Sequence, residues 1–120
     1  MYTLEFFYND NEESEVLNLL LELKEKKETS KDARLNYEKI ILYLEILSQK
    51  GTRAGVPYTD YIGDGIWELR PLRNRILFVL VEGNKILLLH HFIKDTKKTP
   101  QREINQAKKN LKIYNMRKEE

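Results

Sequence analysis

Three apolar runs joined by very short connections restrict the fold of this chain more than any other feature. They are residues 66–72 (IWELRPL), 75–81 (RILFVLV) and 85–93 (KILLLHHFI). Gly83 and Asn84 between the last two runs are typical of a two-residue hairpin, which would place Glu82 opposite Lys85. Residues 71–74 make a similarly tight connection between the first two runs. The sequence therefore predicts an antiparallel β-meander.

The first half of the chain predicts one strand and two helices. Residues 2–8 (YTLEFFY) are aromatic and alternate loosely, which is typical of a strand. Ser14 and Ser30 are each suited to cap a helix, and Gly51 follows the end of the second one. The side chains expected to face the core are Val16, Leu17, Leu20 and Leu21, and then Leu35, Ile40, Ile41, Leu44 and Leu47. The short link between the helices favours an antiparallel helical hairpin.

The remaining segments predict an edge strand and a C-terminal helix. Residues 56–62 lie in an irregular, glycine-containing segment and are expected along the edge of the sheet. Thr99 suits the N-cap of the last helix and Pro100 its first position. The apolar stripe of that helix is Ile104, Ala107, Leu111 and Tyr114. We therefore expect one α+β domain over residues 1–120, in which an N-terminal strand and a helical hairpin pack on an antiparallel β-sheet.

Charge divides the chain into an acidic half and a basic half. Residues 1–65 contain 8 Lys and Arg against 13 Asp and Glu, whereas residues 66–120 contain 13 against 6. The basic half indicates a polyanionic partner such as nucleic acid, although charge can also simply segregate onto solvated helix faces. The chain has no cysteine, no secretory signal pattern at its N-terminus and no apolar window of 18 residues. We expect a cytoplasmic protein without a membrane span.

Several cationic side chains of the meander are expected to converge at one end of the sheet. The tight connection places Arg70 opposite Arg75, where two guanidinium groups about 5 Å apart repel each other unless an oxyanion binds between them. In the predicted hairpin register Arg75 faces Phe92. The residues that flank Phe92 on the same face of the strand are His90 and Lys94. The pattern indicates a site for phosphate.

The two adjacent histidines must face opposite sides of their strand. A bulge or a three-residue turn would bring His91 rather than His90 to the cationic end of the sheet. For the same reason the pair cannot readily hold one metal ion, and we expect no metal and no cofactor. Each feature also has a simpler explanation. Arginines beside a turn are usually solvated, and lysines in a loop before a helix are usually solvent-exposed. A histidine at the end of an apolar strand usually packs against its neighbours or caps the strand.

A longer motif connects these features. It consists of an aromatic-Glu-Leu-Arg strand, an Arg that opens the next strand, Leu-His-x-Phe-x-Lys at the end of a third, and Thr-Pro before a helix. The residues that carry it are Trp67, Glu68, Leu69, Arg70, Arg75, Leu89, His90, Phe92, Lys94, Thr99, Pro100, Glu103 and Ala107. This pattern resembles the RelE/HigB-like toxins of type II toxin–antitoxin systems, in particular the phage-derived branch of the RelE/ParE superfamily. The resemblance covers roughly residues 60–115.

The resemblance implies a small RelE-like domain that cleaves messenger RNA on the ribosome and is inhibited by a cognate helix-turn-helix antitoxin. The implied reaction is attack of the RNA 2′-OH on the adjacent phosphate, without metal. Arg70 and Arg75 would hold the scissile phosphate, and Lys94 would add charge or act as a base if desolvation lowers its pKa. His90, or less favourably His91, would transfer protons. The RNA-binding residues would be Arg73, His91, Lys97, Lys98 and Arg102.

Some positions depart from the family pattern. Asp95 stands where a second lysine is usual, and Ile66 and Glu68 stand where RelE-type members carry lysines. Tyr114 corresponds to a tyrosine that some members use, but its place in the apolar stripe favours packing. The related ParE group shares the fold and targets gyrase, so fold alone does not select the target. A gyrase-inhibiting toxin, a non-catalytic nucleic-acid-binding protein and a module that binds only an acidic antitoxin remain alternatives.

Overall fold

The computed structural model describes residues 1–119 and contains one five-stranded sheet. Its strand order is β1-β5-β4-β3-β2. The strands are β1 (Thr3–Phe6), β2 (Thr59–Gly63), β3 (Ile66–Leu69), β4 (Asn74–Val81) and β5 (Lys85–Ile93). The meander β3-β4-β5 is antiparallel as predicted, and β2 forms the expected edge. However, β1 pairs in parallel with β5, so the sheet is mixed rather than antiparallel throughout.

Three α-helices surround this sheet, and their starts follow the capping pattern in two cases. They are α1 (Glu15–Lys26), α2 (Lys31–Lys50) and α3 (Gln101–Lys118), with a short 3₁₀ turn η1 (Gly51–Ala54) after α2. The hydroxyl oxygens of Ser14 and Ser30 accept hydrogen bonds from backbone N–H groups three residues later, as predicted. Gly51 ends α2 with φ of 60°, where a Cβ would also lie 2.5 Å from the Tyr2 ring.

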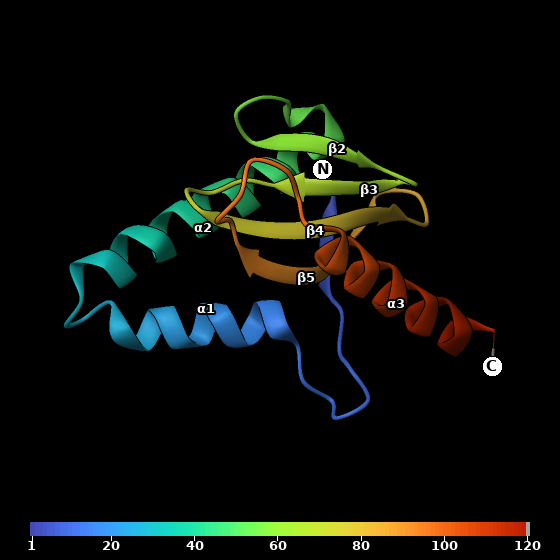
Figure 1. The fold of residues 1–120 in the computed structure, drawn as a ribbon, viewed down its shortest axis with the longest axis horizontal. Helices are drawn as coiled ribbons and strands as arrows, with labels where there is room; N and C mark the ends of the chain where they lie inside the picture. The colour runs from blue at the N-terminus through green and yellow to red at the C-terminus, as the bar shows by residue number, and fades with distance from the viewer. Residues whose placement is uncertain (120) are drawn as a thin grey trace.

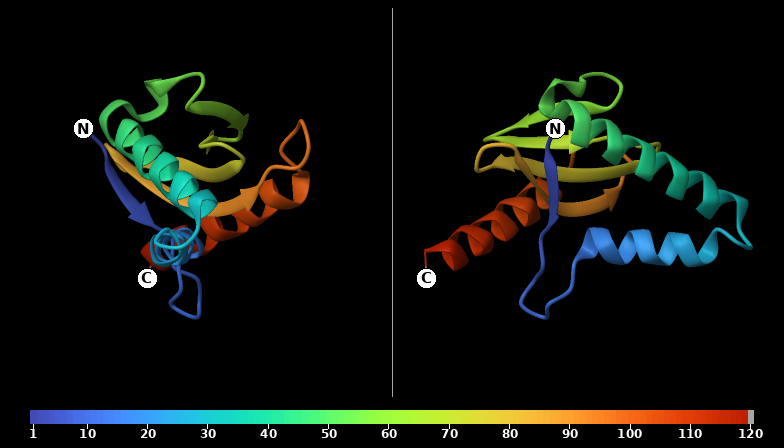
Figure 2. Two further views of the ribbon diagram at one scale, coloured as in Figure 1. Left: turned by 90° about the vertical axis from the view of Figure 1, so that its left-hand side faces the viewer. Right: turned by 180° about the vertical axis from the view of Figure 1, so that it is seen from behind.

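The sheet is covered on both faces. The α1–α2 hairpin lies on one face, and α3 crosses the other, as the front and rear views together show (Figure 1, Figure 2). One core therefore joins both helices of the hairpin to Ile76, Phe78, Ile86 and Leu88 of the central strands. A second core joins α3 to Leu77, Val79, Leu87 and Leu89. Burial on both faces explains why β4 and β5 read as continuous apolar runs rather than as alternating ones.

Two helix positions differ from the expected core. Leu21 and Leu35 were predicted to point inward, but their exposed fractions are 56% and 49%. The joined ends of α1 and α2 project beyond the sheet (Figure 1). Side chains there keep helical spacing but have no strand to pack against. Within residues 1–119, none of the helices has the length and the apolar content that a membrane crossing requires.

The β4–β5 hairpin contains two irregularities that compensate for each other. Val81, not Glu82, pairs with Lys85, so the turn has three residues instead of the predicted two. Asn84 does not adopt positive φ, so the type I′ turn that a Gly-Asn pair suits does not form. Farther along, the register shifts between Leu77 and Phe78, where a bulge adds one residue to β5. Beyond the bulge the ladder returns to the predicted register.

Candidate functional site

The predicted pair of arginines is present at the end of β3 and the start of β4. Leu69 pairs with Ile76, so the same register continued by one residue places Arg70 opposite Arg75. A carboxylate lies between them. Glu68 has Oε2 4.0 Å from the Arg70 Nε and Oε1 3.6 Å from the Arg75 Nε. The repulsion between the two guanidinium groups is therefore partly offset before any ligand binds.

The two arginines differ in their exposure to solvent. The Nη1 of Arg75 donates hydrogen bonds of 2.8 Å to the backbone carbonyl oxygens of Leu72 and Asn74, and the side chain is almost fully buried. Burial lowers the pKa of Arg75, the nearby charge of Arg70 lowers it further, and Glu68 opposes both effects. Arg70 remains 30% exposed. Arg75 is thus a fixed part of the fold, and Arg70 is the guanidinium that a ligand can approach.

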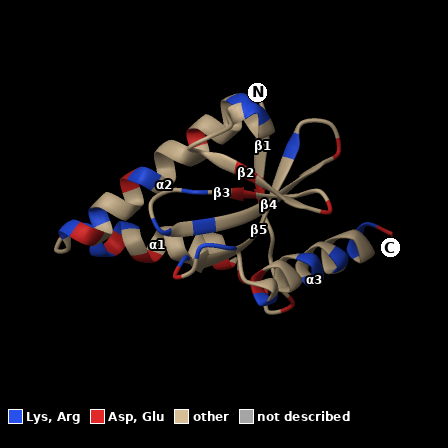
Figure 3. Ribbon diagram, turned by 45° about the horizontal axis from the view of Figure 1, so that its top comes forward, with Lys and Arg blue, Asp and Glu red and all other residues tan. Residues whose placement is uncertain are grey.

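A groove of about 560 Å³ opens between the β3–β4 turn and the loop that follows β5. It is lined by Leu72, Arg73, Arg75, Lys94, Asp95, Thr96 and Lys97. A second groove of about 290 Å³, on the other side of Lys97, includes Glu68, Arg70, Lys98 and Thr99. Figure 3 shows basic segments in the chain just after β3, in β4 and in the loop before α3 near one another. We call the combined surface the basic groove, with cations Arg70, Arg73, Arg75, Lys94, Lys97 and Lys98.

The loop of residues 94–100 is fastened to the sheet at its start. Arg73 donates from Nε and Nη2 to the carbonyl oxygen of Lys94 at 3.1 and 2.9 Å. The backbone N–H of Lys94 in turn donates to the carbonyl oxygen of Arg73 at 2.7 Å. The guanidinium of Arg73 therefore holds the loop, and the side chain of Lys94 is left to face the groove beside Arg75.

The loop is fastened again at its end. Thr99 was predicted to cap α3, but its hydroxyl instead donates a 2.9 Å hydrogen bond to Oε1 of Glu68. Pro100 therefore occupies the N-cap position without a side-chain hydrogen bond, and α3 begins at Gln101. The nearby Arg102 is 75% exposed, with its Nε 3.5 Å from the Glu103 carboxylate. Arg102 belongs to neither part of the basic groove.

His90 lies on the same face of the sheet as Arg75, as predicted, but it does not line the groove. Its Nδ1 lies 2.7 Å from a carboxylate oxygen of Glu15, and its Nε2 lies 2.7 Å from Oε1 of Glu103. Burial opposes a charge on the ring, but the hydrogen bonds and negative charges of Glu15 and Glu103 more than offset it and raise the pKa of His90. Both ring nitrogens are thus occupied by protein.

His91 points to the opposite face of the sheet, also as predicted. Its Nε2 lies 3.0 Å from Oδ1 of Asn74. Burial lowers the pKa of His91 to about 4, and the charge of Glu15 only partly opposes this effect. The ring is therefore neutral near pH 7 and stands outside the basic groove, so the structure does not bring it together with the other predicted RNA-binding residues.

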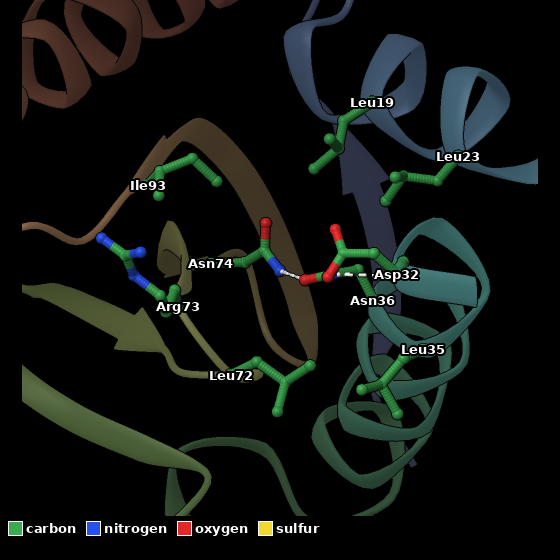
Figure 4. A pocket seen from close by; sticks show the side chains of 9 residues that line it. All are labelled: Leu19, Leu23, Asp32, Leu35, Asn36, Leu72, Arg73, Asn74 and Ile93. Carbon is green, nitrogen blue, oxygen red and sulfur yellow. Dashed lines mark hydrogen bonds between the residues drawn. The ribbon is translucent and has the colours of Figure 1, made fainter. Parts of the chain in front are cut away.

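An apolar groove of about 420 Å³ adjoins the basic groove (Figure 4). It is lined by Leu19, Leu23, Asp32, Leu35, Asn36, Leu72, Arg73, Asn74 and Ile93. Leu72 and Arg73 line both grooves. Leu72 is 41% exposed and has φ of 59°, a left-handed conformation that is rare for leucine. Helical spacing gave no sign of this groove, because it predicts Leu35 in the core.

Sequence reasoning missed the carboxylates of the site. Glu68 shares a strand face with Arg70, so the alternation of side chains along the strand could have identified it as a neighbour of Arg70 and Arg75. Glu103 belongs to the recognised motif but had no role there. Glu15 carries no sequence signal, because it meets His90 from 75 residues away. In the first turns of α1 and α3, both Glu15 and Glu103 also interact favourably with the helix dipoles.

The fold is that of a small α+β domain and is consistent with a RelE-like domain. The sequence model of the family described as "Phage derived protein Gp49-like (DUF891)" matches residues 21–112. The chain belongs to this Gp49-like family, a RelE/toxin-like family. Membership of a toxin-like family implies an antitoxin partner. No curated protein matches the chain in a sequence search.

Proposed function

We propose that this chain is the toxin of a toxin–antitoxin pair and that it cleaves messenger RNA on the ribosome without a metal ion. The observation that carries the proposal is the basic groove. Within residues 1–119, no carboxylate oxygen lies within 4.0 Å of the Nζ atoms of Lys94, Lys97 or Lys98. Cations without protein partners beside fixed guanidinium groups suit a phosphodiester backbone.

The reaction that fits this groove is transesterification. The RNA 2′-oxygen forms a bond to the adjacent phosphorus as the bond to the 5′-oxygen breaks, which gives a 2′,3′-cyclic phosphate and a 5′-hydroxyl end. A base takes the 2′-OH proton, and an acid gives a proton to the leaving oxygen. Arg70 stabilises the added negative charge on the phosphorane oxygens directly, and the buried Arg75 in the groove wall adds its positive charge. Lys94 and Glu68 are the groups beside these guanidiniums that can exchange a proton.

The experiment is cleavage of a defined message in a purified translation system. We expect cuts that depend on the ribosome and leave 2′,3′-cyclic phosphate ends. Arg70→Ala should lower the cleavage rate by about 100-fold or more, the size found when one donor to a transition-state oxyanion is removed. The matched control is Arg34→Ala, which removes an exposed arginine from α2 on the other face of the sheet. Equal rates for Arg70→Ala and the unaltered protein would rule out this site.

One observation favours a second candidate function, a toxin that binds nucleic acid without cutting it. His90, the side chain best suited to proton transfer near neutral pH, has both ring nitrogens held by carboxylates. Growth arrest with intact messages would support this candidate. If arrest were accompanied by altered DNA supercoiling, a ParE-like action on gyrase would be supported instead.

A further inference from the structure

His90 connects the starts of two helices that are distant in sequence. Glu15 is the first residue of α1, and Glu103 lies in the first turn of α3. The His90 ring lies between them, with one nitrogen 2.7 Å from each carboxylate. The Glu15 carboxylate is also fixed by the backbone, because its Oε1 accepts a 3.0 Å hydrogen bond from the N–H of His91, and its Oε2 lies 3.0 Å from the same His90 Nδ1.

With both carboxylates ionised, this geometry places a proton on both ring nitrogens. A neutral imidazole has one N–H donor and one acceptor, so one of its two 2.7 Å contacts would bring a lone pair against a carboxylate oxygen. A protonated ring donates to both. The raised pKa of His90 agrees with this arrangement.

The connection also lies close to the end of the loop of residues 94–100. Glu103 follows the loop by three residues, and the hydrogen bond from Thr99 to Glu68 ties the same end to β3. The start of the loop is held separately by Arg73. Between these anchor points the exposed side chains of Lys97 and Lys98 project along the basic groove.

We propose that His90 is a positioning residue and not a proton donor to RNA: by joining Glu15 to Glu103 it fixes the start of α3, and with it Lys97 and Lys98 over the basic groove. The effect on RNA rests on the proposed function, whereas the effect on the loop does not. The charged and titratable groups around the ring are Glu15 on α1, Glu103 and Arg102 on α3, and His91 on β5 itself. The last is neutral near pH 7, so the two carboxylates dominate.

Two variants separate positioning from proton transfer. In His90→Gln, the amide NH₂ can donate to Glu15, but the amide oxygen then faces the Glu103 carboxylate. Adding Glu103→Gln supplies an NH₂ group for that oxygen and restores a continuous chain of hydrogen bonds without any titratable group. The matched control is Tyr114→Phe, which removes a 3.1 Å hydrogen bond between α3 and Glu5 near the other end of the helix.

The measurements are amide hydrogen exchange, binding of a ten-nucleotide RNA with all 2′-hydroxyls methylated, and message cleavage. For His90→Gln we expect amide exchange in residues 94–105 to accelerate by about tenfold, which is typical of the loss of one charged hydrogen bond. RNA binding should weaken severalfold. The double variant should return exchange, binding and cleavage to within about threefold of the unaltered protein. Tyr114→Phe should leave residues 94–105 and RNA binding unchanged.

Two outcomes would overturn the proposal. A double variant with restored exchange and binding but no cleavage would identify His90 as a proton donor. Unchanged exchange in His90→Gln would show that the ring does not hold the loop. If the unaltered protein does not cleave RNA at all, the proposed function fails, but the exchange measurement still decides the positioning role. Should His90→Gln fail to fold, nuclear magnetic resonance of the unaltered ring serves instead: two N–H protons at pH 6 support the proposal, and one contradicts it.

Discussion

The Oε1 of Glu68 lies 3.6 Å from the Nε of Arg75, and both side chains are more than nine-tenths withdrawn from solvent. They project from neighbouring strands on the face that α3 covers. Thr99 reaches the same carboxylate from the loop. The pair therefore stabilises the fold and also forms the inner wall of the basic groove. Its role in stability and its role in the groove can be tested separately.

Replacing Arg75 and replacing Arg70 should affect the free energy of unfolding differently. Arg75→Ala leaves the buried Glu68 without its nearest cation and two carbonyl oxygens without a donor, so we expect a loss of about 3–5 kcal/mol. Arg70→Ala removes a partly exposed side chain 4.0 Å from the same carboxylate and should cost less than about 1 kcal/mol. Urea unfolding of both variants measures the difference, and equal losses would contradict the assignment of Arg75 as the structural member.

The hydroxyl of Thr99 should matter more than that of Thr96. Thr99→Val removes the hydrogen bond to Glu68 that ties the loop to β3, so we expect a loss of about 1–2 kcal/mol and faster amide exchange in the loop. Thr96→Val is the matched control, because that hydroxyl donates only within the loop, to the carbonyl oxygen of Lys98. Similar exchange in the two variants would show that the Thr99–Glu68 bond does not anchor the loop.

The two histidines should give opposite pH dependences. The pKa of His91 is lowered from 6.5 to about 4 in the folded protein, so its contribution to stability is present above pH 6.5 and is lost as the pH falls toward 4. The loss is on the order of 3 kcal/mol. The pKa of His90 is raised, so its contribution is present below pH 6.5 and is lost as the pH rises through the folded-state value.

The variant His91→Gln tests the contribution of His91, because the glutamine amide can still donate a hydrogen bond to Asn74 but does not titrate. In urea unfolding at pH 7 and pH 4.5, the variant should lose less stability on acidification than the unaltered protein. An identical loss would mean that His91 is not held neutral by the fold.

The left-handed turn residue Leu72 should tolerate asparagine. Leucine with φ of 59° is strained by about 1–2 kcal/mol, and asparagine adopts this conformation more readily. We therefore expect Leu72→Asn to keep or raise the free energy of unfolding by up to about 1 kcal/mol. The control is Leu42→Asn, an equally exposed position in α2, which should lower stability because asparagine is a poorer helix former. Thermal melting of both variants compares them, and a large loss for Leu72→Asn would contradict the strain argument.

Local patterns predicted the parts of the fold that local chemistry controls. Ser14 and Ser30 cap their helices because the cap bonds are made within three residues. The short β3–β4 connection allowed only an antiparallel pair, so it placed Arg70 opposite Arg75. The direction of β1 could not be predicted, because two helices and three strands separate it from β5 in the chain and strand alternation carries no direction.

The candidate site was predictable in its cations and not in its carboxylates. The arginines and Lys94 follow from strand alternation and register. Glu15 reaches His90 only because α1 lies beside β5, a tertiary relationship that no local pattern encodes. Thr99 was assigned as a cap because that is its usual local role, but the buried Glu68 offered its hydroxyl a charged acceptor.

The bulge in β5 divides the strand into two parts whose side chains have different surroundings. Up to Leu89 the side chains follow the two apolar cores, whereas after the bulge only Phe92 is a member of these cores, His90 meets carboxylates and Lys94 lies beside the basic groove. If the strand folded without the bulge, every later side chain would change faces. His91 would then approach Glu103 of α3, and Lys94 would turn toward the face that α1 and α2 cover. In that register Phe92 would also leave the core that it shares with α3, so the misregistered hairpin would lose apolar packing. The choice between the two registers is therefore made jointly by the ionised groups around the two histidines and by this one aromatic side chain.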